Sequence, residues 1–267
     1  MTARVHPTAI VDPGAALGPD VVVGPYCIVG PGVQIGAGTT VGPHAVIQRD
    51  TTLGAGCAVG PGAVLGADPQ DFKYQGEATS LDIGDETRIR EYATLHRGTA
   101  ATGKTVVGKR CYLMAYVHVA HDCVIEDDVV IANAVQLAGH VHVEANATIG
   151  GLTPIHQFVR IGRFALVGGG SRVPQDVPPF TRAAGNPMKL YGINSLGLVR
   201  AGFPAEVRGA LKHAYRLLFN STLSLSQAVE RLRLESSDLP DVMRLVDFVV
   251  SSQRGVPRSG AERGVLV

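Results

Sequence analysis

The sequence predicts an all-β solenoid of short strands followed by a helical C-terminal region, and two observations carry this prediction. The first is a six-residue period: of the 29 positions reached in steps of six from Val5 to Val173, 26 hold Ile, Leu or Val, and the exceptions are Asp71, Glu77 and Ala101. The second is composition, because the 267 residues include 33 glycines and no tryptophan. A period of six fits neither an α-helix nor an alternating strand, but it suits a solenoid whose hexads each form one flat side and a turn.

Two positions inside the hexad recur. A glycine often follows the apolar residue, and we attribute it to corners with unusual backbone angles. The fourth position after the apolar residue is usually small, and all four cysteines fall there, so we expect reduced packing residues rather than metal ligands or nucleophiles. The glycines are Gly18, Gly24, Gly30, Gly36, Gly42, Gly54 and Gly60, and the cysteines are Cys27, Cys57, Cys111 and Cys123.

Two segments, 67–82 and 97–106, interrupt the period and are predicted to be loops that leave the coil. The first is polar enough to hydrogen-bond a sugar or a phosphate, and loops on rigid scaffolds often carry function. In the second, Gly98 to Thr105 matches the phosphate-binding pattern G-x-x-x-x-G-K-T. That motif requires a following helix, whereas here the hexads resume at Val107, so we reject nucleotide hydrolysis.

The period stops after Val173, and residues 204–219, 224–235 and 239–253 then show apolar residues at helical spacing. These helices are predicted to cap the coil stack, because the ends of a solenoid need covering. The predicted domains are therefore a solenoid over 1–183 and a helical domain over 184–267.

Charge and hydropathy limit the function classes. The N-terminus has no signal-peptide pattern and no segment reaches the length of a membrane span, so we expect a cytoplasmic protein without stable membrane insertion. Residues 160–216 hold nine basic and two acidic side chains. This segment could face a phosphate or an acidic protein, or it could be an ordinary basic surface.

The hexads resemble those of the hexapeptide-repeat proteins, which implies a left-handed parallel β-helix with three hexads in each 18-residue coil. Wrapped in this way, His121 lies over Gly139 and then Gln157, with His140 beside Gly139, on a strip two coil spacings long. Histidine suits general-base work near neutral pH, and a glycine N–H can stabilise an oxyanion. The cluster could therefore perform acyl transfer from a thioester to a hydroxyl.

A set of strings along nearly the whole chain resembles one family, the acyl carrier protein-dependent UDP-N-acetylglucosamine O-acyltransferases that begin lipid A synthesis. These strings are His6-Pro7-Thr8-Ala9, Gln70-Asp71-Phe72-Lys73-Tyr74, Ile89-Arg90-Glu91, His96-Arg97-Gly98-Thr99, Ala120-His121-Asp122-Cys123, Leu137-Ala138-Gly139-His140-Val141, His156-Gln157-Phe158, Gln175-Asp176-Val177-Pro178-Pro179 and Gly197-Leu198 with Arg200.

The resemblance implies roles for individual residues. His121 would be the general base that accepts the proton of the glucosamine 3-hydroxyl, and the Gly139 N–H would stabilise the oxyanion. Gly169 would leave room for a long acyl chain, whereas Asp122 is expected to be structural, on the far side of a strand. The sugar nucleotide or the acyl donor would be held by Gln70, Asp71, Lys73, His118, His140, His156 and Gln157, and its phosphates or pantetheine arm by Asn194 and Arg200.

The resemblance also implies a homotrimer with each active site between adjacent subunits, an acyl carrier protein as acyl donor and UDP-N-acetylglucosamine as acceptor. It implies a (R)-3-hydroxyacyl group, no cofactor beyond the donor's phosphopantetheine, no metal and no nucleic acid. Ala201 and Pro187 depart from residues common in the family. They leave open the acyl chain length and the choice between UDP-N-acetylglucosamine and its 3-amino analogue.

Three alternatives are weaker. The related N-acyltransferases carry a uridine-binding domain before the hexads, yet here the hexads begin at Val5. A zinc hydratase of the γ-carbonic anhydrase type needs histidines two coils apart, but Pro154 and Gln157 stand 36 residues after His118 and His121. A purely structural solenoid gives the histidine strip no purpose.

Overall fold

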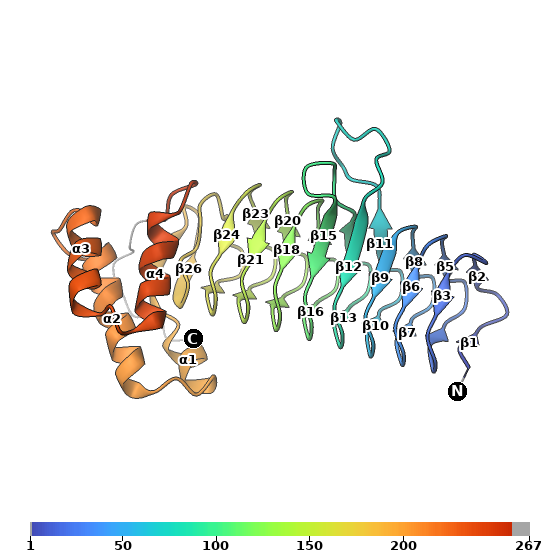
Figure 1. Ribbon diagram of the computed structural model, residues 1–267, viewed down its shortest axis with the longest axis horizontal. Helices are drawn as coiled ribbons and strands as arrows, with labels where there is room; N and C mark the ends of the chain where they lie inside the picture. The colour runs from blue at the N-terminus through green and yellow to red at the C-terminus, as the bar shows by residue number, and fades with distance from the viewer. Residues whose placement is uncertain (1, 258–267) are drawn as a thin grey trace.

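The structure is a computed structural model that describes residues 2–257, and most of it is a three-sided coil of short parallel strands (Figure 1). Each side of the coil is one sheet. The first sheet holds β1 (Arg4–Val5), β4 (Val22–Val23), β7 (Thr40–Val41), β10 (Ala58–Val59), β13 (Arg88–Ile89), β16 (Tyr112–Leu113), β19 (Val130–Ile131), β22 (Thr148–Ile149), β25 (Leu166–Val167), β26 (Thr181–Ala184) and β27 (Lys189–Ile193).

The other two sides have eight strands each. The second sheet holds β2 (Ile10–Val11), β5 (Ile28–Val29), β8 (Val46–Ile47), β11 (Val64–Ala67), β14 (Thr94–His96), β17 (His118–Val119), β20 (Gln136–Leu137) and β23 (Pro154–Ile155). The third holds β3 (Ala16–Leu17), β6 (Gln34–Ile35), β9 (Thr51–Leu53), β12 (Ser80–Ile83), β15 (Lys104–Val107), β18 (Val124–Ile125), β21 (His142–Val143) and β24 (Arg160–Ile161).

The coils stack in the predicted register, in which each residue lies beside the residue eighteen positions later in the sequence. Around the histidine cluster, His118 pairs with Gln136 and Gln136 with Pro154. The spacing widens to thirty between Val64 and Thr94, and to twenty-four between Thr94 and His118. The extra residues form the two loops, and the pairing of the coils continues across both, with one register shift between Leu65 and Ala67 where the first loop begins.

The apolar frame residues fill the interior. From Val23 to Val173 every Ile, Leu or Val of the six-residue frame is buried, whereas Val5, in the first coil, is 43% exposed. The four cysteines are free and buried among them, as predicted. Burial raises the pKa of the Cys111 thiol to about 11 and that of Cys123 to about 12, so these thiols stay protonated at neutral pH.

The glycine after each apolar residue has a different cause from the predicted one. Left-handed backbone angles occur two residues further on, for example at Tyr26 (φ 57°) and His44 (φ 59°), and not at Gly24. A Cβ on Gly36 would instead lie 2.5 Å from the carbonyl carbon of Gly54 in the next coil. These glycines therefore allow the backbones of successive coils to approach closely.

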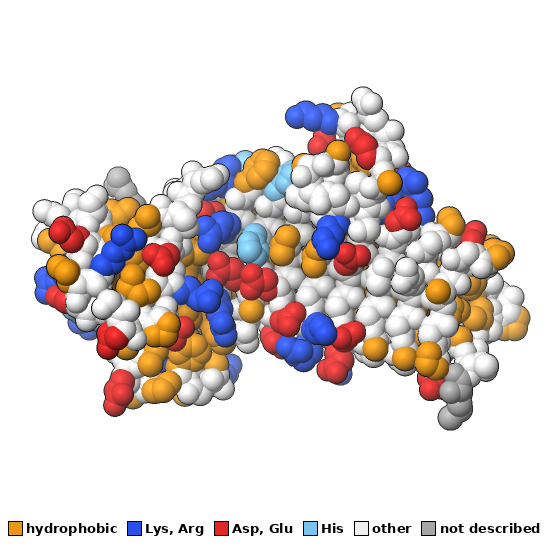
Figure 2. All heavy atoms as spheres, in the orientation of Figure 1, with side chains coloured by type: hydrophobic (Ala, Val, Ile, Leu, Met, Phe, Trp, Pro, Cys, Tyr) orange, Lys and Arg blue, Asp and Glu red, His pale blue; other side chains and the backbone are white. Residues whose placement is uncertain are grey.

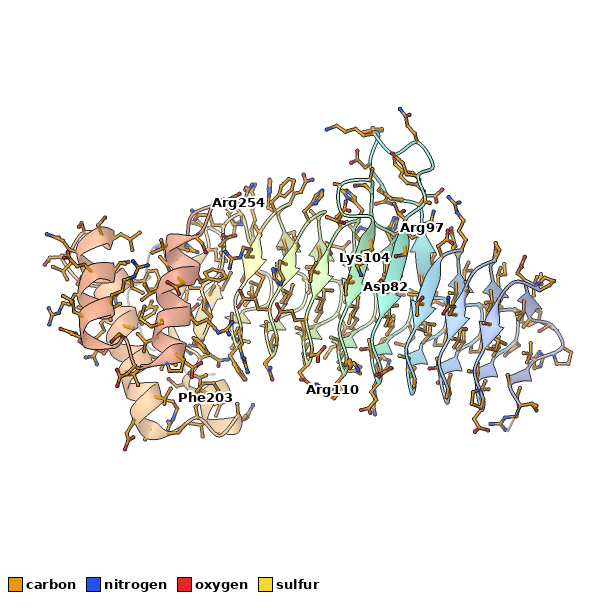
Figure 3. All side chains as sticks on the ribbon, in the orientation of Figure 1. Asp82, Arg97, Lys104, Arg110, Phe203 and Arg254 are labelled. Carbon is orange, nitrogen blue, oxygen red and sulfur yellow. The ribbon has the colours of Figure 1, made fainter. Side chains whose placement is uncertain are left out.

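Both predicted loops leave the same corner of the coil, between the second and third sheets, and project to one side of it (Figure 1). They are shorter than predicted, spanning 68–79 and 97–103, because β11, β12 and β15 extend into them. Lys104 begins β15, which confirms that no helix follows the phosphate-binding pattern. Arg97 lies at the base of the loops, and Lys104 pairs with Asp82 across the third sheet at 3.4 Å (Figure 3).

A different corner carries charge. Arg110 there bonds Asp128 through two contacts of 2.8 Å, and Lys109 bonds Asp85 at 2.8 Å. Acidic and basic side chains accordingly stand side by side along the lower edge of the coil in Figure 2, where Figure 3 labels Arg110. These exposed ladders tie one coil to the next, and each pair contributes little stability by itself.

The C-terminal region begins with a hairpin rather than a helix. β26 continues the first sheet in parallel, and β27 returns antiparallel to it. Up to residue 257, four helices follow and cover the end of the coil (Figure 1); the three longer ones were predicted, whereas α1 was not. They are α1 (Ser195–Arg200), α2 (Ala205–Phe219), α3 (Leu225–Glu235) and α4 (Pro240–Val250).

Aromatic packing attaches the helices to the coil. The Phe203 ring, which precedes α2, lies 5.1 Å from that of Phe164 and 6.0 Å from that of Phe180, both at turns of the last coils. The Arg160 guanidinium lies 4.2 Å from the ring centre of Phe248 on α4.

Residues 258–267, which were predicted to belong to the helical domain, lie outside the part of the chain that the structure describes. Over the described residues, no helix is long and apolar enough to cross a membrane.

Candidate active site

The predicted cluster lies at the corner between the second and third sheets, in the coils that follow the two loops. His121 occupies the first position of the turn between β17 and β18, and Gly139 occupies the same position one coil later. The backbone N–H of His140 donates to the His121 carbonyl at 3.0 Å, and that of Phe158 donates to the Gly139 carbonyl at 3.2 Å. The stacking on which the predicted site depends is therefore present.

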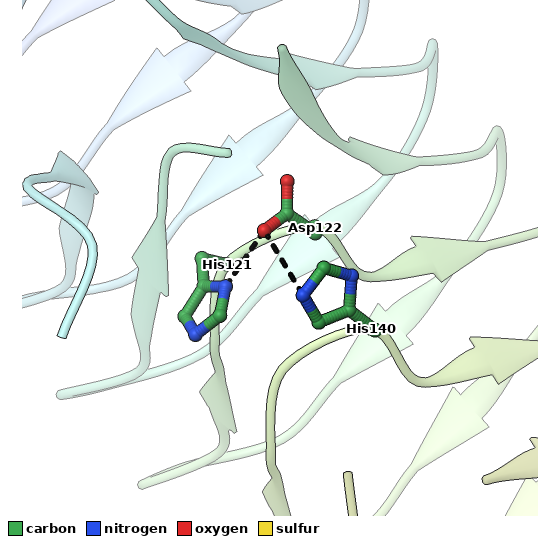
Figure 4. A group of neighbouring side chains, drawn as sticks. All are labelled: His121, Asp122 and His140. Atoms are coloured by element: carbon green, nitrogen blue, oxygen red, sulfur yellow. Dashed lines mark hydrogen bonds and ion pairs between the residues drawn. The ribbon is translucent and has the colours of Figure 1, made fainter. Parts of the chain in front are cut away.

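His121 has a carboxylate partner that the sequence reading rejected. Its Nδ1 lies 2.7 Å from Oδ2 of Asp122 (Figure 4). We expected Asp122 to point to the far side of a strand, and this was wrong because residues 121–122 form a turn in which Asp122 has a φ of 61°. Strand alternation does not apply there, so neighbouring side chains reach the same space.

Asp122 is buried and strongly hydrogen-bonded. Burial by itself raises the pKa of this carboxyl, but hydrogen bonds from Thr102, His121 and Thr99 outweigh that effect and lower the pKa to about 2. Asp122 is therefore ionised at neutral pH. An ionised acceptor at Nδ1 favours the tautomer with a proton on Nδ1, which leaves Nε2 of His121 as a proton acceptor.

A glycine at position 139 leaves room for the His121 ring in its observed place. A Cβ on Gly139 would lie 2.6 Å from Cε1 and 2.7 Å from Nε2 of His121. The backbone N–H at this first position of the turn takes no part in the hydrogen bonds between coils. Within residues 2–257 no acceptor contacts the Gly139 N–H. In earlier hexads this first turn position often holds proline, which has no N–H: Pro7, Pro13, Pro19, Pro25, Pro31, Pro43 and Pro61. The Gly139 N–H is thus available to an external acceptor.

Further rings extend the strip. His140 meets the His121 ring edge-on, with centroids 5.3 Å apart, and stacks on Phe158 at 4.5 Å. On the outer face of β17, His118 meets His96 at 5.1 Å. Burial, aided by the neighbouring His96 and His121, lowers the pKa of His118 to about 4. His118 is consequently neutral at pH 7 and able to share a hydrogen bond.

Two histidines and a carboxylate also raise the question of a metal. The ligand atoms of His121, Asp122 and His140 all lie within 4.8 Å of one another (Figure 4). Each oxygen of Asp122 already accepts two hydrogen bonds, from Thr99 and Thr102 at Oδ1 and from Thr99 and His121 at Oδ2. A carboxylate has about four lone-pair positions, so a cation would have to displace these donors. The arrangement fits a hydrogen-bonded histidine better than a metal centre.

The structure does not gather every predicted residue. Gly169 is exposed at the corner between the first and second sheets, away from His121. Asn194 caps α1, accepting from the Gly197 N–H at 3.2 Å and donating to the Phe164 carbonyl at 3.0 Å, at the third corner. Arg200 is exposed on the last turn of α1. One chain therefore presents the predicted residues on three different corners.

The remaining predicted residues lie near the histidine corner. His156 is exposed and Gln157 half-buried in the coil after Gly139, and Gln70 and Lys73 are exposed on the longer loop. The side chain of Asp71 accepts from the Lys73 N–H at 2.9 Å, which shapes the tip of that loop. The sequence reading missed Asp122, Phe158, Thr99 and Thr102. Thr99 lies in one of the strings that resemble the family, but the resemblance gave it no role, and only the T-x-x-T spacing inside the phosphate-binding pattern linked it to Thr102.

Comparisons with known proteins agree with the fold. A family model described as UDP-N-acetylglucosamine O-acyltransferase, domain 2, matches residues 176–257, and one for the bacterial transferase hexapeptide matches 2–37, 32–67 and 104–139. The UDP-N-acetylglucosamine O-acyltransferase of Moraxella catarrhalis has a solved structure with a TM-score of 0.93 and 43% identity, over 97% of this chain and 100% of that one. The predicted fold class, a left-handed parallel β-helix with C-terminal helices, is confirmed.

Relatives in sequence cover nearly the same length. An acyl-[acyl-carrier-protein]–UDP-N-acetylglucosamine O-acyltransferase of Alkalilimnicola ehrlichii is 55% identical over 96% of this chain and 99% of its own. The corresponding protein of Thiobacillus denitrificans is 49% identical over 96% of this chain and 100% of its own.

Proposed function

The chain belongs to the UDP-N-acetylglucosamine O-acyltransferase family, and on this premise we propose that it uses His121 as a general base to move a (R)-3-hydroxyacyl group from acyl carrier protein to the 3-hydroxyl of UDP-N-acetylglucosamine. This reaction is the first step of lipid A biosynthesis. The observation that carries the proposal is the contact of 2.7 Å between His121 and Asp122, with the free Gly139 N–H one coil away.

The mechanism follows from the roles of these groups. Nε2 of His121 accepts the proton of the acceptor hydroxyl while the hydroxyl oxygen attacks the thioester carbonyl carbon. The carbonyl oxygen becomes an oxyanion, which the Gly139 N–H stabilises. Collapse breaks the carbon–sulfur bond, and the imidazolium returns its proton to the departing thiolate. Ionised Asp122 stabilises the imidazolium during the interval, so no metal or cofactor is needed.

The neighbouring polar groups are proposed to hold the substrates. Neutral His118 and the imidazole of His140 flank His121 along the strip and can share hydrogen bonds with a sugar or an amide. Asp71 and Lys73 reach out on the loop 68–79, with Gln70 beside them, and suit contacts to a sugar nucleotide. His156 and Gln157 extend the strip toward the helices, where we expect the acyl donor.

A homotrimer would explain why the predicted residues lie on three corners of one chain. Copies related by a threefold axis can bring different corners to one cleft. The outer face of the second sheet suits such an interface because it carries no charge. Its outward residues are Ile10, Ile28, Val46, Val64, Thr94, His118, Gln136 and Pro154.

We propose that the acidic acyl carrier protein docks near the helices. A cavity of about 320 Å³ lies between β27 and α2 and is lined by Arg182, Lys212 and Arg216, with no carboxylate in its wall. All three belong to the basic segment 160–216. Such a surface would steer an acidic partner toward the coil.

The test is an assay of the purified protein with (R)-3-hydroxyacyl carrier proteins and UDP-N-acetylglucosamine, with mass spectrometry of the product. His121→Ala should abolish transfer while sedimentation still reports a trimer. His142→Ala is the matched control, because His142 pairs with Glu126 on the third sheet. Near-normal turnover of His121→Ala would reject the base, and acylation of only the 3-amino analogue would change the acceptor from hydroxyl to amine.

A further inference from the structure

The loop 97–103 contains the first six residues of the phosphate-binding pattern, yet it surrounds a different anion, the carboxylate of Asp122. It connects β14 to β15, one coil before His121, and folds over the carboxylate of Asp122. Gly98 allows the two ends of the loop to approach, because a Cβ on residue 98 would lie 2.4 Å from the backbone nitrogen of Lys104. Gly103 supplies the left-handed turn, with a φ of 76°. The glycines that would surround a phosphate in other proteins thus shape a site for a carboxylate here.

Thr99 contacts both oxygens of Asp122. Its backbone N–H donates to Oδ1 at 2.9 Å, and its hydroxyl donates to Oδ2 at 2.8 Å. The hydroxyl oxygen also accepts from the Ala101 N–H at 3.2 Å, which leaves the hydroxyl proton directed at the carboxylate. Both Thr99 and Asp122 are buried, so these bonds are not weakened by competition with water.

Two more threonines complete the enclosure. The Thr102 hydroxyl lies closer to Oδ1 of Asp122 than to its other acceptor, the Lys104 carbonyl at 2.9 Å. The Thr105 hydroxyl accepts from the Asp122 N–H at 2.8 Å and fixes the backbone of the turn. The fourth donor to the carboxylate is Nδ1 of His121. The orientation of the carboxylate is therefore fully determined by its partners.

We propose that the loop 97–103 is a carboxylate cradle in which Thr99 and Thr102 act as positioning residues for the reaction. They keep Asp122 ionised and keep Oδ2 directed at His121. The torsion that rotates an aspartate carboxylate is soft, so without these donors the carboxylate would turn and His121 would lose its fixed tautomer and ring orientation. This inference rests on the proposed function, because it assigns an effect on the base that His121 provides.

The experiment compares Thr99→Val and Thr99→Ser in steady-state assays of the whole protein. Thr99→Val keeps the shape and the backbone donor but removes the hydroxyl. We expect kcat to fall about tenfold, the lower end of the loss seen when outer-shell partners that orient a metal-binding histidine are removed. KM for UDP-N-acetylglucosamine should change less than about twofold, because Thr99 holds a carboxylate rather than substrate. Thr99→Ser should restore most of kcat.

A double-variant cycle separates positioning from general stability. In the Asp122→Asn background, Thr99→Val should change kcat less than about twofold, because the carboxylate it orients is gone. Thr39→Val is the matched control. The buried Thr39 hydroxyl likewise accepts from an N–H, but it donates to the Gly54 carbonyl instead of a carboxylate and lies far along the coil from Asp122. This control should leave kcat unchanged.

The outcomes distinguish the two proposals. A wild-type protein that transfers no acyl group refutes the proposed function whatever the variants do. An active wild type combined with full kcat in Thr99→Val, or with an equal loss in the Asp122→Asn background, overturns the cradle alone.

Discussion

Replacing Gly139 by alanine is a direct test of how far the site depends on the placement of one ring. The backbone of Gly139 does not have a left-handed φ, so alanine can adopt it, and the N–H proposed to stabilise the oxyanion is retained. The new methyl group would lie 2.6 Å from Cε1 of His121, whereas ordinary contacts begin at 3.4 Å. The imidazole must therefore move by about 0.8 Å, the difference between the two distances.

That movement has two measurable consequences. It displaces Nδ1 from a hydrogen bond of 2.7 Å to Asp122, and a misplacement of about 1 Å at a reacting group costs about 10²-fold in rate, so kcat should fall by about that factor. Crowding the ring should also lower the free energy of unfolding by about 1–3 kcal/mol.

The assay is steady-state turnover with saturating substrates, together with urea unfolding and sedimentation. Gly209→Ala is the control, because its Cβ would meet nothing within 4 Å and it lies inside α2, where alanine should stabilise by about 1 kcal/mol without changing kcat. A Gly139→Ala protein whose kcat stays within about twofold of wild type would refute the dependence of the reaction on His121 placement.

Three further predictions concern other parts of the molecule. Burial holds the pKa of His118 at about 4, below its value in the unfolded chain, so the unfolded chain binds more protons than the folded one as the pH falls from about 6.5 to 4. Urea unfolding should therefore show up to about 2 kcal/mol less stability at pH 5 than at pH 7, and His118→Gln should remove that part of the pH dependence. Arg97→Met should lower the free energy of unfolding by about 1–3 kcal/mol and raise KM for UDP-N-acetylglucosamine, because the fully buried guanidinium bonds the Gly66 carbonyl and Asp68 at the base of the loop 68–79. An unchanged free energy of unfolding and an unchanged KM would argue against this anchor. Gly169→Met should shift kcat/KM toward shorter acyl donors because it adds bulk at an exposed corner, and an identical profile across donors of graded length would exclude this residue from the acyl groove.

The fold was predictable because its determinant is a strict period in sequence. A buried Ile, Leu or Val every sixth residue specifies each short strand, and a coil of constant length turns sequence distance into stacking. For the same reason, the separation of eighteen residues between His121 and Gly139 was enough to predict that the two stack in successive coils. The three longer helices were also predictable, since apolar residues at helical spacing mark the core-facing side of each.

The partner of His121 was not predictable from the period. Strand alternation suggested that Asp122 points away, but a left-handed turn residue follows a different geometry. The role of Thr99 was hidden as well, because a motif match gives residue types without the anion that they surround. The reason for the corner glycines was also misread, since close approach of coils depends on packing between segments eighteen residues apart.

The sequence by itself determined the architecture, the register and the column of residues that includes His121, Gly139 and Gln157. Only the tertiary structure decided which groups meet: the loop 97–103 reaches across one coil to hold Asp122, and Asp122 in turn orients His121. The physical reason is that a repeat sets the backbone path locally, coil by coil. Hydrogen bonds between side chains depend instead on torsions at turns and on loops that the period does not encode.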